Sequence, residues 1–239
     1  YGNKAFLSLN SFPFCMRYYK NLVIIGTSHI SPDSIKIVES LILNKKPDVV
    51  AIELDKGRFL GLMSGEKSKI GLKEIKIIGV KGFVFAKFGQ WIEKKLGSKI
   101  GVSPGDEMIK AARTAEIVKA KIALIDQPIE ITLKKFSKRI TWKEKFRFVW
   151  DLLTGWFRKD MKINIDLKKV PEEKVIEQMI GIVRRRYPNV YDVLIAERNV
   201  VMAKHLNKLM QNYNSVIAVV GAGHEKEVIE EIRKSQKEL

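Results

Sequence analysis

Cysteine is nearly absent from this sequence, and histidine is scarce. The 239 residues contain one cysteine, Cys15, and three histidines. A single cysteine excludes an intramolecular disulfide framework and any zinc site built from several thiolates. No apolar run approaches the roughly 18 residues that a membrane-spanning helix needs, and the start of the chain lacks the apolar segment of a signal peptide. Because the chain begins at Tyr1 and not at methionine, we expect it to be a piece of a longer protein.

Several catalytic and nucleotide-binding motifs are also missing. The H-E-x-x-H motif does not occur, so ordinary zincin chemistry is excluded. The G-x-S-x-G turn of serine hydrolases is absent too, which disfavours that mechanism. No Walker A motif or G-x-G-x-x-G is present, because Gly221 and Gly223 are followed by His224 and charged residues. Nucleotide binding is therefore weakly supported.

Basic residues, by contrast, are in large excess. Lys and Arg number 44 against 27 Asp and Glu, which gives a formal net charge of +17. This surplus favours contact with nucleic acid, an anionic membrane surface or an acidic partner. Nucleic acid ranks last of these, since no motif of the known nucleic-acid modules is present. The hydrophobic fraction of 46% is enough for a sizeable core.

Two copies of a G-x-x-H pattern follow apolar runs near the two ends of the chain. The first is Gly26-Thr27-Ser28-His29 and the second is Gly221-Ala222-Gly223-His224. Each reads as a buried strand, a tight turn and a helix. In open α/β sheets, chemistry is located beyond the carboxyl ends of the strands. We therefore expect His29 and His224 to share one site, the alternative being two turns whose histidines only cap or pack.

The apolar runs predict four strands, separated by helical segments, at residues 22–26, 49–53, 121–126 and 216–220. Parallel strands require crossovers, which these helices supply. The predicted fold class is α/β, with a mainly parallel central sheet, helices on both faces and a helical insertion. Residues 1–21 are expected to form an irregular or strand-like lead-in. Residues 22–239 are expected to form the α/β domain, with helical insertions near 80–120 and 129–187.

Carboxylates occur at the ends of two of these strands. Glu53 ends the second apolar run, and Asp126 ends the third. A buried carboxylate is costly unless it is paired or bound to a metal. For Glu53 the alternatives are a strand that ends earlier, leaving the side chain solvated, or an ion pair with Arg58. With the two histidines, these carboxylates suit a divalent metal that keeps an open position for water.

One long helix is predicted from Asn189 to about Gln211, and it carries two charges outside any clear polar stripe. Glu197 and Arg198 have apolar residues one turn before and one turn after them. Long charged side chains can snorkel from such positions to the surface. The other interpretation is that both face an interior site.

Two basic, aromatic segments, Phe83–Leu96 and Trp142–Phe157, are predicted to be amphipathic helices beside the site. We expect them to expose apolar surface, which suits a membrane interface or a partner helix. The alternative is that their aromatic rings pack on one another or mediate a homodimer.

Taken together, six motifs in this order resemble the TraB/pheromone-shutdown family, over roughly residues 22–235. They are Gly26-Thr27-Ser28-His29, the run from Pro47 to Asp55, Gly105-Asp106-Glu107-Met108, Ile125-Asp126-Gln127-Pro128-Ile129 with Thr132, Glu197-Arg198-Asn199 with Met202-Ala203, and Gly221-Ala222-Gly223-His224. That family is grouped with the Tiki metalloproteases and, more remotely, with erythromycin esterases. Gln127 departs from the pattern, because the family usually has arginine there.

The resemblance implies a divalent-metal-dependent peptidase, with manganese, cobalt or zinc as the cofactor. His29, Glu53 and His224 would hold the metal. Glu197 and Arg198 would be the catalytic residues. Apart from the resemblance, the chemistry of arginine indicates that Arg58 or Arg198 binds a substrate carboxylate or a developing oxyanion. The expected partners are a peptide or protein substrate and an anionic membrane surface. The expected location is membrane-associated or cytoplasmic, with membrane-spanning segments outside this chain. The alternative function is a non-catalytic module that binds or sequesters a peptide.

Overall fold

A computed structural model describes residues 16–27, 32–64, 105–154 and 173–237. His29 and the segment Phe83–Leu96 lie outside these residues, as do residues 1–15 of the predicted lead-in. In the described part of the chain, no helix is both long enough and apolar enough to cross a membrane.

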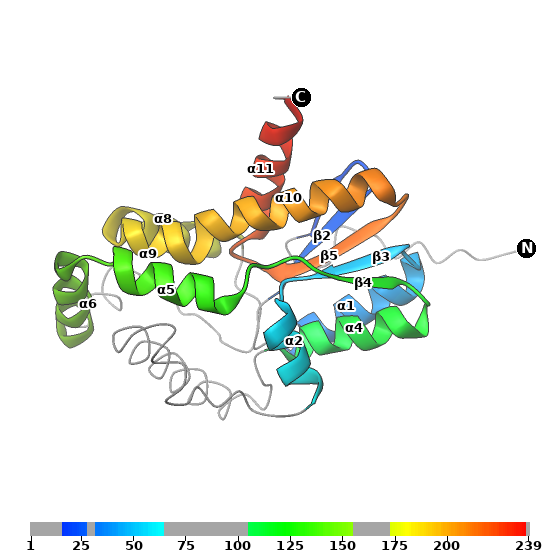
Figure 1. The fold of residues 1–239 in the computed structure, drawn as a ribbon, viewed down its shortest axis with the longest axis horizontal. Coiled ribbons are helices and arrows are strands. Elements are labelled where there is room, and N and C mark those ends of the chain that lie inside the picture. Colours follow the sequence, from blue (N-terminus) through cyan, green and yellow to red (C-terminus); the bar gives the residue numbers. More distant parts are fainter. Residues whose placement is uncertain (1–15, 28–31, 65–104, 155–172, 238–239) are drawn as a thin grey trace, which may run out of the picture.

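A five-stranded sheet forms the centre of the fold, with the strand order β1-β2-β5-β3-β4 (Figure 1). Its strands are β1 Met16–Tyr19, β2 Leu22–Thr27, β3 Val49–Ile52, β4 Lys121–Leu124 and β5 Val216–Gly221. β2, β3, β4 and β5 run parallel to one another, and β1 pairs with β2 in the antiparallel direction. The predicted mainly parallel α/β fold is thus confirmed. Part of the lead-in forms the extra edge strand β1.

Both faces of the sheet are covered by helices, because side chains of the central strands alternate between two apolar clusters. Val50 and Ile52 pack with helices α1 (Pro32–Lys45) and α4 (Asp106–Ile117). Val49 and Ala51 pack on the other face with α10 (Glu197–Asn212) and α11 (Glu225–Lys237). Strands buried on both faces read as continuous apolar runs, which is why the sequence revealed them.

The structure differs from the prediction at two strand ends and in one helix. β3 ends at Ile52 and β4 ends at Leu124, so Glu53 and Asp126 lie beyond the strands and not in them. A short helix α2, Lys56–Met63, follows β3 directly, with Asp55 as its N-cap accepting a hydrogen bond from the Arg58 backbone. This helix was missed, although an aspartate before a periodic segment is its usual sequence signal.

The remaining described helices lie together beyond the carboxyl edge of the sheet, at the left of Figure 1. They are α5 Ile129–Arg139, α6 Trp142–Thr154, α8 Glu173–Arg186 and α9 Pro188–Tyr191. The single helix predicted from Asn189 to Gln211 is interrupted, because a π-helical turn at Asp192–Ala196 joins α9 to α10. Its wider turn is closed by a hydrogen bond from the Glu197 amide to the Asp192 carbonyl. Such insertions change the direction of every side chain that follows, and they are frequent at functional sites.

Helix α6 is fixed to α8 and α9 by polar side chains. Asp151 is fully buried and accepts hydrogen bonds from Arg186 and from the Tyr187 hydroxyl. The bonds from Arg186, acting against burial, hold the pKa of Asp151 below its usual value. Burial and Asp151 together raise the pKa of Tyr187 to about 12. Glu144 lies two turns before Asp151 on the same face of α6, and it accepts hydrogen bonds from Thr141 and Asn189.

Replacing Asp151 with asparagine should therefore lower the free energy of unfolding by about 2 kcal/mol at neutral pH. A lowered folded-state pKa means that the stabilisation is complete above the ordinary value of 3.8 and is lost as the pH falls through the folded-state pKa. Urea unfolding at several pH values measures this. The difference between the Asp151→Asn variant and the unsubstituted protein should shrink in acid. Asp192→Asn, an exposed position, is the control, and an equal loss in both variants would contradict the anchoring role of Asp151.

Candidate functional site

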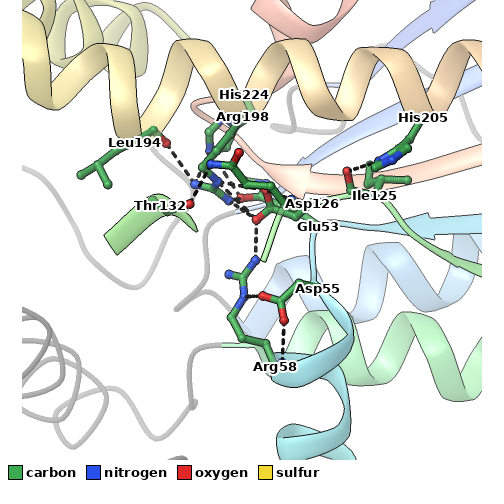
Figure 2. Close-up of polar contacts among 12 residues, drawn as sticks. Glu53, Asp55, Arg58, Ile125, Asp126, Thr132, Leu194, Arg198, His205 and His224 are labelled. Atoms are coloured by element: carbon green, nitrogen blue, oxygen red, sulfur yellow. Dashed lines mark hydrogen bonds and ion pairs between the residues drawn. The ribbon is translucent and has the colours of Figure 1, made fainter. Parts of the chain in front are cut away.

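Three side chains that follow different strands meet at the carboxyl edge of the sheet. Glu53 comes after β3, Asp126 after β4 and His224 after β5. Arg198, from the first turn of α10, reaches down between them, as Figure 2 shows. Glu53 and Asp126 are 5% and 1% exposed at their side chains. The alternative that Glu53 is solvated is thus wrong, because the side chain turns inward after the strand has ended.

The Arg198 guanidinium directs every N–H toward an acceptor. Its Nη2 donates to Glu53 and, at 2.7 Å, to Asp126. Its Nε lies 3.1 and 3.2 Å from the two Asp126 oxygens. Its Nη1 donates to the Leu194 carbonyl in the π-helical turn at 3.0 Å and lies 3.2 Å from Nε2 of His224. The π turn therefore supplies one of the contacts that orient this side chain.

Charge pairing outweighs burial at Arg198. Burial alone would lower the pKa of the guanidinium, but the attraction of Glu53 and the hydrogen bonds to Asp126 raise it above its usual value. The side chain is only 15% exposed and remains a cation. Since its N–H groups are all used, Arg198 in this conformation positions two carboxylates and offers no further donor to a substrate.

A chain of hydrogen bonds across α9, α10 and α11 ends at Nδ1 of His224 and fixes the imidazole ring. Its Nδ1 lies 2.6 Å from Oδ1 of Asn199. The Asn199 amide nitrogen donates to Glu227 at 2.7 Å, which fixes the orientation of the amide group. The Tyr191 hydroxyl donates to the other Glu227 oxygen, also at 2.7 Å. Burial and this carboxylate raise the pKa of Tyr191 well above its usual range.

This chain sets the tautomer of the imidazole. Because Oδ1 of Asn199 can only accept, Nδ1 of a neutral His224 carries the proton. Its Nε2 is then an acceptor that faces Arg198 and lies 3.3 Å from Oε1 of Glu53. The second oxygen of Glu53 accepts the Gly221 backbone N–H at 2.6 Å. The His224 imidazole and the Glu53 carboxylate thus point toward each other, and each is fixed by a further hydrogen bond, to Asn199 and from Gly221 respectively.

Arg58 joins the same cluster from α2. It donates to Asp126 through Nη2 and to Asp55 through Nε at 2.6 Å. Burial tends to raise the pKa of Asp55, but the backbone and side-chain bonds from Arg58 lower it below its usual value. The Arg58 side chain is partly exposed, and Figure 2 marks no hydrogen bond from its Nη1 to the residues that it draws. Among those residues, Arg58 is the cation that has a donor pair to offer.

Glu197, a neighbour of Arg198 in the chain, points elsewhere. It pairs with Lys135 at 2.6 Å and with Arg139, both on α5. Burial tends to raise the pKa of Glu197, but these two cations lower it. Gln127 donates to Thr132 at 2.8 Å, and Nδ1 of His205 lies 2.8 Å from the Ile125 carbonyl. The structure thus brings together Glu53, Arg58, Arg198 and His224 of the predicted site residues, while Glu197 faces α5.

Sequence reasoning did not select Asn199, Glu227 or Tyr191. Asn199 was named only as a member of the Glu197-Arg198-Asn199 motif, with no role assigned to it, and the structure shows that this polar residue is 1% exposed. Among the described residues, no three His, Cys, Asp or Glu side chains form a group able to hold a metal ion. His29, the remaining predicted ligand, lies outside them.

Residues 19–237 match the TraB/PrgY/gumN family. An uncharacterised protein of Methanocaldococcus jannaschii is 38% identical over 219 residues, which cover 90% of this chain and 54% of that protein. TraB domain-containing proteins of Homo sapiens and Bos taurus are each 25% identical over 227 residues, or 84% of this chain. Those residues cover 60% and 59% of the two mammalian proteins, so the chain spans little more than half the length of these relatives. The chain belongs to the TraB/PrgY/gumN family.

Proposed function

We propose that this domain is a divalent-metal-dependent hydrolase that acts on a peptide or protein. The observation that carries the proposal is the approach of His224 Nε2 to Glu53 Oε1 at 3.3 Å. This is about the spacing of two ligand atoms on one tetrahedral ion with bonds of about 2.0–2.1 Å. The donor types, a neutral imidazole and a carboxylate, also suit manganese, cobalt or zinc.

Glu53, His224 and His29 are the proposed ligands. Thr27, the last described residue of β2, pairs with Gly221 at the end of β5. The chain therefore enters the segment that contains His29 beside the turn that carries His224. When bound, a divalent metal polarises a substrate carbonyl and lowers the pKa of water. The hydrogen bonds from His224 Nδ1–H to Asn199 Oδ1 and from the Gly221 N–H to Glu53 orient the two described ligands, as partners behind metal ligands generally do.

The two arginines take different parts in the proposal. Arg198 pairs with both Glu53 and Asp126 and holds the two carboxylates in place, so it is a positioning residue. Arg58 has a donor pair left for the carbonyl or carboxylate of a peptide, since guanidinium groups bind carboxylates strongly. From the sequence, Glu197 is assigned the role of accepting a proton from water. To take that role, Glu197 must first leave its salt bridges with α5. The peptide substrate class comes from the family resemblance.

Calorimetry with manganese, cobalt and zinc, paired with a peptide-cleavage assay, tests the proposal. The unsubstituted protein should bind one metal ion and cleave peptide, whereas His29→Ala and His224→Ala should lose both properties together. His205→Ala is the matched control, because His205 contacts the Ile125 carbonyl away from the cluster. If both site variants bind metal as well as the unsubstituted protein, or no preparation binds metal, the hydrolase proposal fails.

The second candidate is a module that binds a peptide without cleaving it. One observation favours it: the Arg198 guanidinium already pairs with both buried carboxylates and contacts His224. A cluster that is satisfied in this way can be structural. Peptide binding that is retained without metal and without cleavage would select this alternative.

A further inference from the structure

Helix α6 differs from an ordinary surface helix, because its acidic side chains face inward and its largest aromatic side chains face outward. Glu144 and Asp151 are 5% and 0% exposed and face α8 and α9 through the bonds described above. Residues seven apart in a helix lie on the same side, so these two carboxylates mark the inner face. No acidic residue of α6 between Trp142 and Asp151 lies outside this face.

The outward side of the same helix is aromatic. Trp142, Phe146 and Trp150 are 64%, 71% and 65% exposed. Their spacing of four residues places them in one stripe, and the rings of Trp142 and Phe146 lie 6.1 Å apart. In Figure 1 the helix is at the far left edge of the fold, away from the sheet. Folding within the described residues therefore leaves this stripe at the surface.

Cations border the stripe. Lys143 follows Trp142 directly and is exposed, and the Lys145 ammonium lies 4.7 Å from the centre of the Trp142 ring. Since the acidic groups of α6 face inward, the outer surface of this helix carries aromatic and positive groups together.

We propose that the outer face of α6 docks on the surface of an anionic lipid bilayer. An amphipathic helix that lies in the interface buries aromatic side chains at the headgroup boundary and keeps lysines at its borders. Tryptophan suits this layer, since its ring is apolar and its N–H is polar. A bilayer also matches the charge, because each lysine near an anionic surface contributes about 1 kcal/mol. The +17 formal charge of the chain acts in the same direction.

The docking face and the candidate site lie at the same end of the molecule. Helix α5 follows Asp126 by two residues and leads directly to α6, and both lie beyond the carboxyl edge of the sheet (Figure 1). A protein bound to lipid through α6 would keep that edge close to the membrane. The inference concerns a surface only, so it does not depend on whether the site hydrolyses anything.

Vesicle co-sedimentation tests the proposal with the full chain. Vesicles of phosphatidylcholine and phosphatidylserine should bind the protein at low salt, and vesicles of phosphatidylcholine alone should bind it much less. Replacing Trp142, Phe146 and Trp150 with alanine should weaken binding at least about tenfold, since large apolar side chains are removed from the interface. Lys143→Gln with Lys145→Gln should weaken it by about thirtyfold and flatten the salt dependence. Ile117→Ala is the matched control, because this side chain on α4 is 68% exposed and apolar.

A second measurement does not depend on the triple variant folding. In a protein with Trp91→Phe and Trp156→Phe, only Trp142 and Trp150 remain of the four tryptophans. Brominated lipids in anionic vesicles should quench their fluorescence. The proposal is overturned if these tryptophans are not quenched, or if the aromatic variant binds vesicles as well as the Ile117→Ala control. It is also overturned if light scattering shows a lipid-free dimer that the aromatic substitutions dissociate, because the face is then a protein interface.

Discussion

Replacing Arg198 with methionine should lower the free energy of unfolding by about 3–5 kcal/mol. The substitution removes the cation that bonds Glu53 and Asp126, two carboxylates that are almost fully buried. Methionine is similar in length and fills part of the space, so the loss comes mainly from two negative charges left without this partner. Urea unfolding at neutral pH, followed by circular dichroism, measures the change.

Arg139→Met is the matched control for this experiment. Arg139 also pairs with a glutamate, Glu197, but its side chain is 49% exposed. Exposed pairs contribute about 0–1 kcal/mol, so this variant should remain close to the unsubstituted protein. Adding Glu53→Gln and Asp126→Asn to Arg198→Met should recover part of the lost stability, since the buried charges disappear. Equal losses for Arg198→Met and Arg139→Met would show that the buried cluster does not hold the domain together.

The strands of the sheet were predictable because the same requirement, an apolar side chain, applies at each successive position. Strands buried on both faces need apolar side chains at every position, and Val49 to Ile52 and Val216 to Val220 show this plainly. The edge strand β1 was harder to predict. Met16–Tyr19 pairs with one neighbour only, and its burial pattern does not alternate, because three of its side chains are half-buried and one is exposed. Its sequence does not differ clearly from that of an irregular segment.

The site was predictable to the level of residue positions but not of side-chain direction. Glu53, Asp126 and His224 could be placed because each follows a strand, and parallel strands end at one edge. Glu197 and Arg198 could not be separated, because neighbours on a helix point about 100° apart and the π turn before them shifts that direction. Only the structure shows Arg198 in the cluster and Glu197 against α5.

Which side of α6 is buried was likewise not predictable from the sequence. A period of 3.6 residues separates an aromatic side from a polar side, but it does not say which side is buried. Partners far along the chain decide this: Arg186 and Asn189 bond Asp151 and Glu144. The expectation of exposed apolar surface agrees with the exposure of Trp142, while its purpose is the subject of the vesicle experiment.

Replacing Asn199 with leucine should weaken metal binding by about 10–100-fold, as the loss of a partner behind a histidine ligand usually does. Leucine has a similar size but cannot accept the Nδ1 proton of His224 or donate to Glu227. The imidazole then loses its preference for the Nδ1–H tautomer, and its Nε2 is protonated in part of the molecules. Calorimetry measures the affinity, and nitrogen chemical shifts of the His224 ring report the tautomer without any reference to catalysis.

Asn207→Leu is the control that separates positioning from stability. Asn207 lies on the same helix and also bridges α10 to α11, through hydrogen bonds with Ser235 and Gln236. Its replacement should cost a similar amount of stability, about 1 kcal/mol per hydrogen bond, and leave the His224 tautomer unchanged. If Asn199→Leu keeps the proton on Nδ1, then the chain from Tyr191 through Glu227 to Asn199 only joins the helices. A third outcome is that Asn199→Leu changes the tautomer while even the unsubstituted protein binds no metal. The hydrogen-bond chain then orients His224 for a role other than metal binding. In that case the hydrolase proposal fails, and the positioning role of Asn199 stands.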